Sequence, residues 1–133
     1  MKKPSDNKLK RLWSRAVIAK YKYCPITGER DNLQAHHIVP KGRQNRFALR
    51  WDIRNGVPLH PTAHRKIHDG DLVTQRKLLE YIDARGDTEY LMRMKSVLKH
   101  EFLNRHMQMT EDEYRQSTSK ILEGIINDVQ RID

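Results

Sequence analysis

Apolar residues near the start of the chain recur with the period of an α-helix. From residue 6 to about residue 20 they form one stripe, which consists of Leu9, Leu12, Trp13, Ala16 and Val17. The opposite face is basic and carries Lys8, Lys10, Arg11 and Arg15. Residues 1–23 are therefore predicted to contain a basic amphipathic helix.

The next part of the chain, from Tyr21 to Gly70, has a broken pattern. Proline, glycine, asparagine and histidine interrupt short apolar runs, which favours turns and short strands. Residues 33–39 and 57–59 are predicted strands. Residues 61–68 are a predicted short helix, because Pro61 suits its first turn and Gly70 lies just past its end.

Beyond Asp71 the apolar pattern predicts three helices. Leu72, Leu79 and Ile82 mark the first, which ends near Gly86. Asp87 is expected to cap the second, whose inner face consists of Tyr90, Leu91, Met94, Val97, Leu98 and Phe102. Thr110 and Glu113 form a capping-box signature ahead of the third. The apolar face of this last helix, from Ile121 to Ile132, suits either a core or a homodimer seam, and we favour the core.

Length and composition limit the class of protein. With 133 residues, of which 37% are hydrophobic and 32% charged, the chain has the size of a single domain and is too short for a barrel enzyme or a full dinucleotide-binding fold. No run approaches the roughly 20 apolar residues that span a bilayer, and the first residues resemble no signal peptide. One cysteine, Cys24, forms no internal disulfide. We therefore expect no membrane association and a cytoplasmic location.

The net charge of +9 is concentrated in the first half. Residues 1–70 carry 16 Lys and Arg against 5 Asp and Glu, whereas residues 71–133 carry 10 against 12. This asymmetry is typical of a half that binds a polyanion followed by an ordinary folded half. Nucleic acid is the leading candidate partner, and a merely soluble surface is the alternative.

Five of the seven histidines lie between positions 36 and 68: His36, His37, His60, His64 and His68. His64 and His68 are four residues apart, so on a helix both rings lie on one face and can hold one cation. His36 and His37 are neighbours in a predicted strand and point to opposite faces. Only one of them can join the pair on a metal, which leaves the other for acid–base chemistry. Three imidazole ligands favour a transition metal and leave positions open for water and substrate.

These motifs resemble the HNH endonucleases of the His-Me finger group. The resemblance rests on Ala35-His36-His37-Ile38-Val39-Pro40-Lys41-Gly42, on Arg54-Asn55-Gly56-Val57-Pro58-Leu59-His60, and on Ala63-His64-Arg65-Lys66-Ile67-His68. It implies an α+β, mostly helical fold in which a ββα-metal core, residues 24–70, is flanked by the N-terminal helix and a helical region, residues 71–133. It also implies a metal-dependent DNA endonuclease that leaves 5′-phosphate ends, and this small protein looks like a phage or mobile-element enzyme.

The resemblance assigns roles to particular residues. His37 would be the general base that takes a proton from the attacking water, and Asn55 would fix the loop that orients it. His36, His64 and His68 would hold one divalent ion, Mg²⁺, Mn²⁺, Ni²⁺ or Zn²⁺; the His-His doublet looks more like that of the colicin-type DNases. A histidine base and a cation suit phosphodiester hydrolysis on chemical grounds.

The chain departs from many HNH proteins at a structural zinc. Where those proteins carry two Cys-x-x-Cys pairs, the matching positions are Cys24, Thr27, His60 and Ala63. A structural zinc is therefore not expected. Cys24 and His60 are either relics of one or packing residues, and we expect the terminal helices to brace the core instead.

Basic residues around the motif are predicted to contact DNA phosphates. They are Lys41, Arg43, Arg46, Arg50, Arg54, Arg65 and Lys66. Phe47 and Trp51 in the same region either stack on bases or pack in the core, and we favour packing. Two other functions stay open: a non-catalytic nucleic-acid-binding module with a structural metal, and a subunit whose partner supplies specificity. The residues do not choose among homing, packaging, recombination and restriction.

Overall fold

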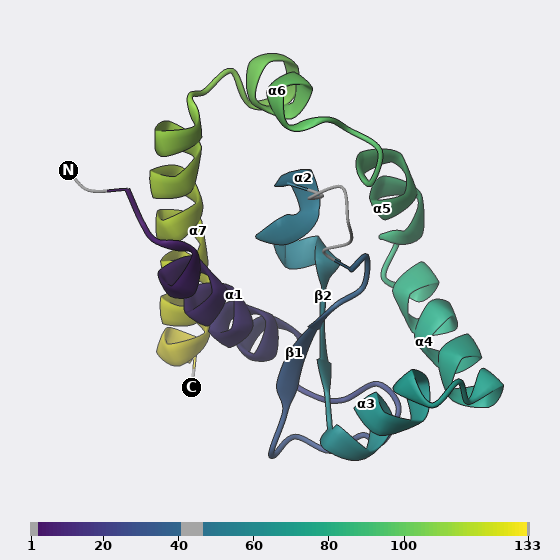
Figure 1. Cartoon of the computed structure of the whole chain (residues 1–133). Coiled ribbons are helices and arrows are strands. Elements are labelled where there is room, and N and C mark those ends of the chain that lie inside the picture. Colours follow the sequence, from purple (N-terminus) through teal and green to yellow (C-terminus); the bar gives the residue numbers. More distant parts are fainter. Residues whose placement is uncertain (1–2, 41–46, 133) are drawn as a thin grey trace.

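The fold consists of helices arranged around one small two-stranded sheet. The computed structural model describes residues 3–40 and 47–132. In chain order these residues form α1 (Asp6–Tyr21), β1 (Gln34–His37), α2 (Phe47–Arg50), a 3-10 turn η1 (Ile53–Asn55), β2 (Gly56–Leu59), α3 (Pro61–His68), α4 (Leu72–Ala84), α5 (Thr88–Met94), α6 (Lys99–Glu101), a π-helical segment η2 (Phe102–Met107) and α7 (Glu111–Ile132). The predicted α+β, mostly helical class is confirmed (Figure 1).

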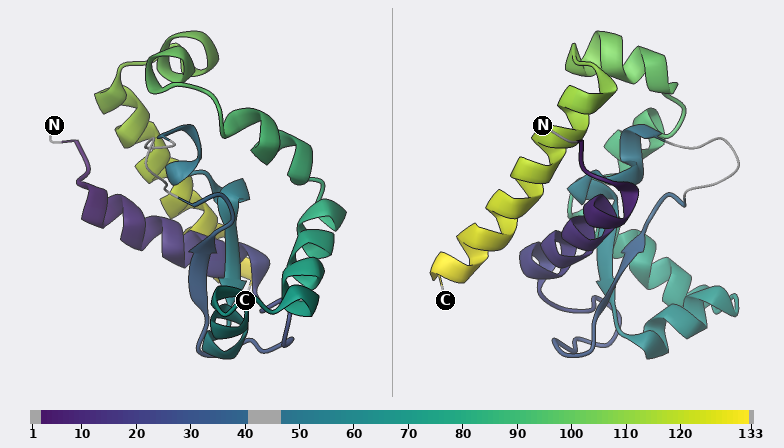
Figure 2. Two further views of the ribbon diagram at one scale, coloured as in Figure 1. Left: turned by 45° about the vertical axis from the view of Figure 1, so that its right-hand side comes forward. Right: turned by 60° about the vertical axis from the view of Figure 1, so that its left-hand side comes forward.

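The two strands form an antiparallel hairpin at the centre of the fold. His36 pairs with Val57 and His37 pairs with Gly56. α1 contacts both strands and crosses α7, whereas α3 packs on β2 and α4 packs on α3. Figures 1 and 2 show α1 and α4 on opposite sides of the hairpin. The N-terminal helix thus lies against the strands, where bracing was expected, whereas α7 packs on α1 and η2.

The predicted stripe of α1 is buried as a whole, and Ser5 caps the helix by accepting a hydrogen bond from the Lys8 amide at 3.1 Å. α1 and β2 approach closely at Gly56. A Cβ atom on Gly56 would lie 2.3 Å from Cγ2 of Val17, so only glycine fits at this crossing. α3 and the Thr110–Glu113 capping box also form as predicted, the latter with reciprocal bonds of 3.1 and 3.2 Å.

The prediction of one continuous helix after Asp87 is wrong. The segment divides into α5, α6 and η2, and Leu98 is extended between the first two. This bend lets Phe102 reach the rings of Phe47 and Tyr114, at centroid distances of 6.1 and 5.2 Å. Asp87 occupies the N-cap position of α5 but makes no side-chain cap, because its carboxylate binds two arginines instead.

The C-terminal apolar positions are buried only in part. On α4, Leu78 and Ile82 are buried, whereas Leu72 and Leu79 are exposed. On α7, Leu122 and Ile126 enter the core, and Ile121 is 58% exposed. The described part of the last helix therefore supplies core residues, as favoured, and the homodimer stays a prediction. Among the described residues, no helix has the length and apolar character needed to cross a membrane.

Candidate active site

Three of the predicted histidines lie together on one side of the hairpin. The ring of His36, on β1, lies 4.8 Å from that of His64 between centroids, and the ring of His64 lies 6.1 Å from that of His68. Both of the latter residues belong to α3. Burial and then the neighbouring imidazoles lower the pKa of His36. A lowered pKa favours the neutral imidazole, which is the form that binds metal ions.

The donor set fits a divalent transition metal by its chemistry, because neutral imidazoles are ligands that such ions prefer. The ring of His64 lies between the other two, in contact with that of His36 and with that of His68. Within residues 3–40 and 47–132, no group of three or more His, Cys, Asp or Glu side chains is placed so that it could hold a metal ion. The three-histidine ligand set therefore stays a prediction.

His37 faces the other side of β1, as the alternation of a strand requires. Its ring stacks on Trp13 of α1 with centroids 4.0 Å apart and an interplanar angle of 9°. Its Nε2 lies 2.9 Å from the carbonyl oxygen of Arg50. Because a carbonyl only accepts, Nε2 carries the proton, and the basic nitrogen of the neutral ring is Nδ1.

Asn55 is fully buried and ties three segments together. Its Oδ1 accepts from the Val39 amide at 2.7 Å, and its Nδ2 donates to the carbonyls of Val39 and Leu49 at 3.1 Å each. The amide of Ile38 also donates to the Asn55 carbonyl at 2.9 Å. The end of β1 and the helix α2 are thereby held against η1.

The clustered histidines and Asn55 lie in a segment that matches a known protein family. Residues 24–73 match the family model described as HNH endonuclease. This segment, which is less than half of the chain, is similar to HNH endonucleases. No curated protein and no solved structure matches the chain significantly. The HNH segment contains β1, α2, β2 and α3, so α1 and the helices from α5 onward lie outside it. The match supports a nuclease-type function in general, and HNH nucleases generally act on DNA with a divalent metal.

A polar pocket of about 250 Å³ adjoins His37 in the HNH segment. Its lining comprises Asp6, Asn7 and Lys10 of α1 together with His37, Arg50 and Trp51. Half of these residues belong to α1, which sequence reasoning did not include in the site. The burial of Trp13 was predictable from its place on the apolar stripe, but its stacking on His37 was not.

The predicted DNA-binding residues differ in their surroundings. Arg65 and Lys66 are exposed on α3, beside His64. The guanidinium of Arg50 pairs with Asp6 at 3.2 Å, and that of Arg54 pairs with Asp87 at 2.6 Å. Lys41, Arg43 and Arg46 lie outside the described residues. Arg65 and Lys66 are thus available to a phosphate, whereas Arg50 and Arg54 already have anionic partners.

Arg85, which sequence reasoning missed, holds the backbone on both sides of Asn55. Its guanidinium donates to the carbonyls of Arg54 and Gly56 at 2.8 Å each and pairs with Asp87 at 2.8 Å. It also lies over the ring of Tyr21 at 4.0 Å. Because Arg85 follows the HNH segment in the sequence, the helical region contributes directly to the position of η1.

Cys24 and His60 have packing roles. Cys24 is fully buried. Burial raises the pKa of its thiol, but hydrogen bonds from the His60 amide and from Thr27 outweigh this effect and lower the pKa. The Nδ1 of His60 caps α3 by accepting from the Thr62 amide at 3.2 Å, and its Nε2 donates to the Glu29 carboxylate at 2.8 Å. Hydrogen bonds thus link the segments that a structural zinc joins in many HNH proteins.

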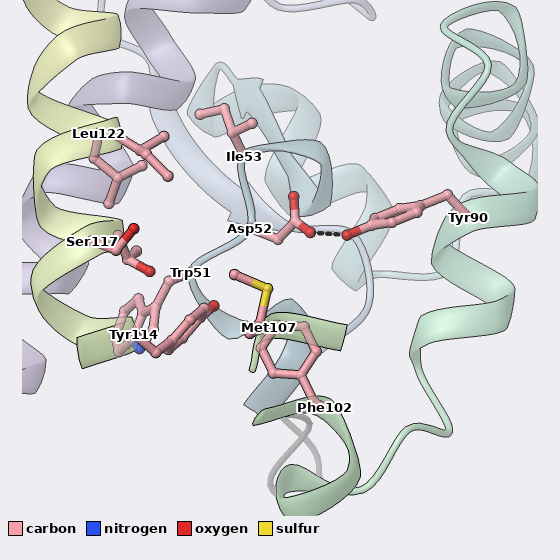
Figure 3. Close-up of a pocket in the computed structure, with 11 residues that line it drawn as sticks. Trp51, Asp52, Ile53, Tyr90, Phe102, Met107, Tyr114, Ser117 and Leu122 are labelled. Carbon is pink, nitrogen blue, oxygen red and sulfur yellow. Dashed lines mark hydrogen bonds between the residues drawn. The ribbon is translucent and has the colours of Figure 1, made fainter. Parts of the chain in front are cut away.

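A further pocket of about 190 Å³ lies between α7, η2 and α5 (Figure 3). Apolar side chains form much of its wall: Trp51, Phe102, Met107, Tyr114 and Leu122. Tyr90 donates a hydrogen bond to Asp52 across it, and burial together with this bond raises the pKa of Tyr90. Trp51 and Phe47 are both 3% exposed, so their predicted packing role is confirmed.

Proposed function

We propose that this chain is a metal-dependent DNA endonuclease that hydrolyses phosphodiester bonds and leaves 5′-phosphate and 3′-hydroxyl ends. One observation carries the proposal: adjacent histidines of β1 meet different partners. His36 faces the histidines of α3, whereas His37 faces a polar pocket with one ring nitrogen held by a carbonyl. Hydrolysis needs both a cation site and a separate base, and this division supplies residues for each.

The role proposed for His37 follows from its tautomer. With Nε2–H donating to the Arg50 carbonyl, Nδ1 accepts the proton of the attacking water. The water oxygen then bonds to phosphorus, and the bond from phosphorus to the 3′-oxygen breaks. The carbonyl still accepts from Nε2–H in the imidazolium that forms, so the hydrogen bond orients the ring before and after proton transfer.

The proposed ligands of the divalent ion are His36, His64 and His68. When bound, such an ion supplies positive charge that stabilises the pentavalent phosphorus and the leaving alkoxide. The lowered pKa of His36 favours its neutral ring, which is the form that coordinates a metal ion. Arg65 and Lys66, on the same helix as His64, are proposed to contact neighbouring phosphates.

Asn55 is proposed to orient the base through the backbone. Its side chain donates to the Leu49 carbonyl, and the next carbonyl along the chain, that of Arg50, accepts from His37. Fixing one peptide group restricts the next, because neighbouring peptide planes share a Cα atom. Asn55 is therefore a positioning residue with no proposed contact to the reacting atoms.

The test is cleavage of supercoiled plasmid DNA by the wild type, first with EDTA and then with Mg²⁺, Mn²⁺, Ni²⁺ or Zn²⁺ added. The key variant is His37→Gln, because the glutamine amide can still donate to the Arg50 carbonyl but is not a base. His100→Ala is the control, since His100 is an exposed histidine on α6. We expect metal-dependent nicking or cutting that falls by 100-fold or more in His37→Gln and persists in the control, in line with the roughly 10²–10⁴-fold contribution of a general base.

Binding of the same DNA, measured in parallel, separates the alternatives. If DNA is bound but stays intact with every metal, the endonuclease proposal is wrong and a non-catalytic binding module replaces it. If His37→Gln cleaves as fast as the wild type, the proposal of an endonuclease stands, but His37 is not its general base.

A further inference from the structure

The solvent face of α1 is predominantly basic where it adjoins the candidate active site. Four exposed cations occupy it: Lys8, Lys10, Arg11 and Arg15. The one acidic residue of this helix is Asp6, and its two carboxylate oxygens pair with Arg50 at 3.2 Å and with Arg115 at 2.7 Å. A polyanion that approaches this face meets four cations and an acid whose charge is already compensated.

The basic face is also fixed in place relative to His37. Trp13 of α1 stacks on the His37 ring, and Lys10 and Asn7 form part of the wall of the pocket beside it. An ordinary solvated helix face has no such link to a catalytic group. Lys10 and Arg15 are five positions apart, about 7.5 Å along the helix axis at 1.5 Å per residue, which corresponds to about two base-pair steps of 3.4 Å.

We propose that α1, which lies outside the HNH segment, is a phosphate-binding helix that holds the backbone of duplex DNA beside His37 through Lys10 and Arg11, with Lys8 and Arg15 extending the contact. This inference rests on the proposed function insofar as DNA is the substrate. Of these four cations, Lys10 lines the same pocket as the proposed base His37. Arg11 is the next residue of the helix and lies toward the solvent.

Binding is measured by fluorescence anisotropy with a labelled 30-base-pair duplex across a series of salt concentrations. EDTA is present so that the DNA stays intact. The variant is Lys10→Gln/Arg11→Gln in the full chain, and a charge-preserving swap, Lys10→Arg/Arg11→Lys, tests whether charge alone matters. The matched control is Arg76→Gln/Lys77→Gln, which also removes two adjacent exposed charges, but from α4 on the other side of the hairpin (Figure 1).

The slope of log K against log salt is negative, and each lost phosphate contact reduces its magnitude by about 0.9. We therefore expect the slope of the Lys10/Arg11 variant to be smaller in magnitude by about 1.8 and its binding to be on the order of 10-fold or more weaker near 0.1 M salt. The charge-preserving swap and the α4 control are expected to keep the wild-type slope. Circular dichroism checks that every variant is folded.

Equal slopes for the Lys10/Arg11 variant and the α4 control would overturn the inference, as would a wild type that does not bind the duplex. Plasmid cleavage is scored separately. If cleavage by the wild type is observed but the slope does not change, the proposed function stands and the role of α1 is wrong. If the slope changes but no metal supports cleavage, α1 binds DNA and the endonuclease proposal fails.

Discussion

Replacing Arg85 with methionine is expected to loosen the turn that carries Asn55. Arg85 lies at the end of α4, and its side chain is 12% exposed. Its three interactions reach the Arg54 carbonyl, the Gly56 carbonyl and the Asp87 carboxylate, each at 2.8 Å. Methionine keeps an unbranched stem of similar length over Tyr21 and removes every donor. The substitution therefore tests the hydrogen bonds with little change in packing.

The magnitude follows from what the substitution leaves behind. A hydrogen bond to a charged group contributes about 1.5–3 kcal/mol, and breaking a buried ion pair by removing one partner costs about 3–5 kcal/mol. These figures overlap, because the same guanidinium makes all three interactions, and Arg54 still pairs with Asp87 at 2.6 Å. We expect a loss of about 3–4 kcal/mol in the free energy of unfolding. This is a large fraction of the roughly 5–15 kcal/mol that stabilises a domain.

Urea denaturation followed by circular dichroism measures this loss. Arg85→Lys is expected to lose less, about 1–2 kcal/mol, because lysine keeps the charge but not the planar fork. Arg76→Met is the control, an exposed residue of α4 whose replacement is expected to change stability by less than about 0.5 kcal/mol. If Arg85→Met lowers the free energy of unfolding by less than about 1 kcal/mol, the reasoning is refuted. The guanidinium of Arg85 would then not hold η1 in place.

Two further changes test packing and pH dependence. Gly56→Ala is expected to lower the unfolding free energy by about 1–3 kcal/mol, because the new Cβ would lie 2.3 Å from Cγ2 of Val17. Adding Val17→Ala should restore part of this loss. Thermal unfolding of the single and the double variant measures both effects. Burial raises the pKa of Tyr114 from 10.0 to about 12, so the unfolded chain loses this proton first and stability falls as the pH rises from 10 through 12. Tyr114→Phe should flatten that decline in urea titrations, and an unchanged decline would contradict the assignment.

Local sequence patterns predicted the elements whose causes are local. The stripe of α1, the proline at the start of α3 and the capping box of α7 each act within a few residues, so periodicity and capping rules were sufficient. The long helix predicted after Asp87 breaks at Leu98, which is extended, and Phe102 beyond the break packs on Phe47 and Tyr114 from distant segments. The side-chain cap predicted at Asp87 is absent because its carboxylate binds Arg54, 33 positions away in the sequence.

The sequence by itself determined which chemistry is present and how it is spaced. An adjacent histidine pair in a strand had to divide between two faces, and His64 and His68 had to share one face of a helix. The tertiary structure decided what each face meets. It placed His36 beside α3 and His37 against Trp13, and it paired Arg50 and Arg54 with carboxylates from α1 and the start of α5.

The role of Arg85 shows why these partners were not predictable. Its acceptors near Asn55 are main-chain carbonyls 29 and 31 positions away, and every residue type has such a carbonyl. No side-chain pattern marks that contact. Periodicity and spacing report on neighbours along one helix or strand, whereas the partners of a buried charge depend on how distant segments pack.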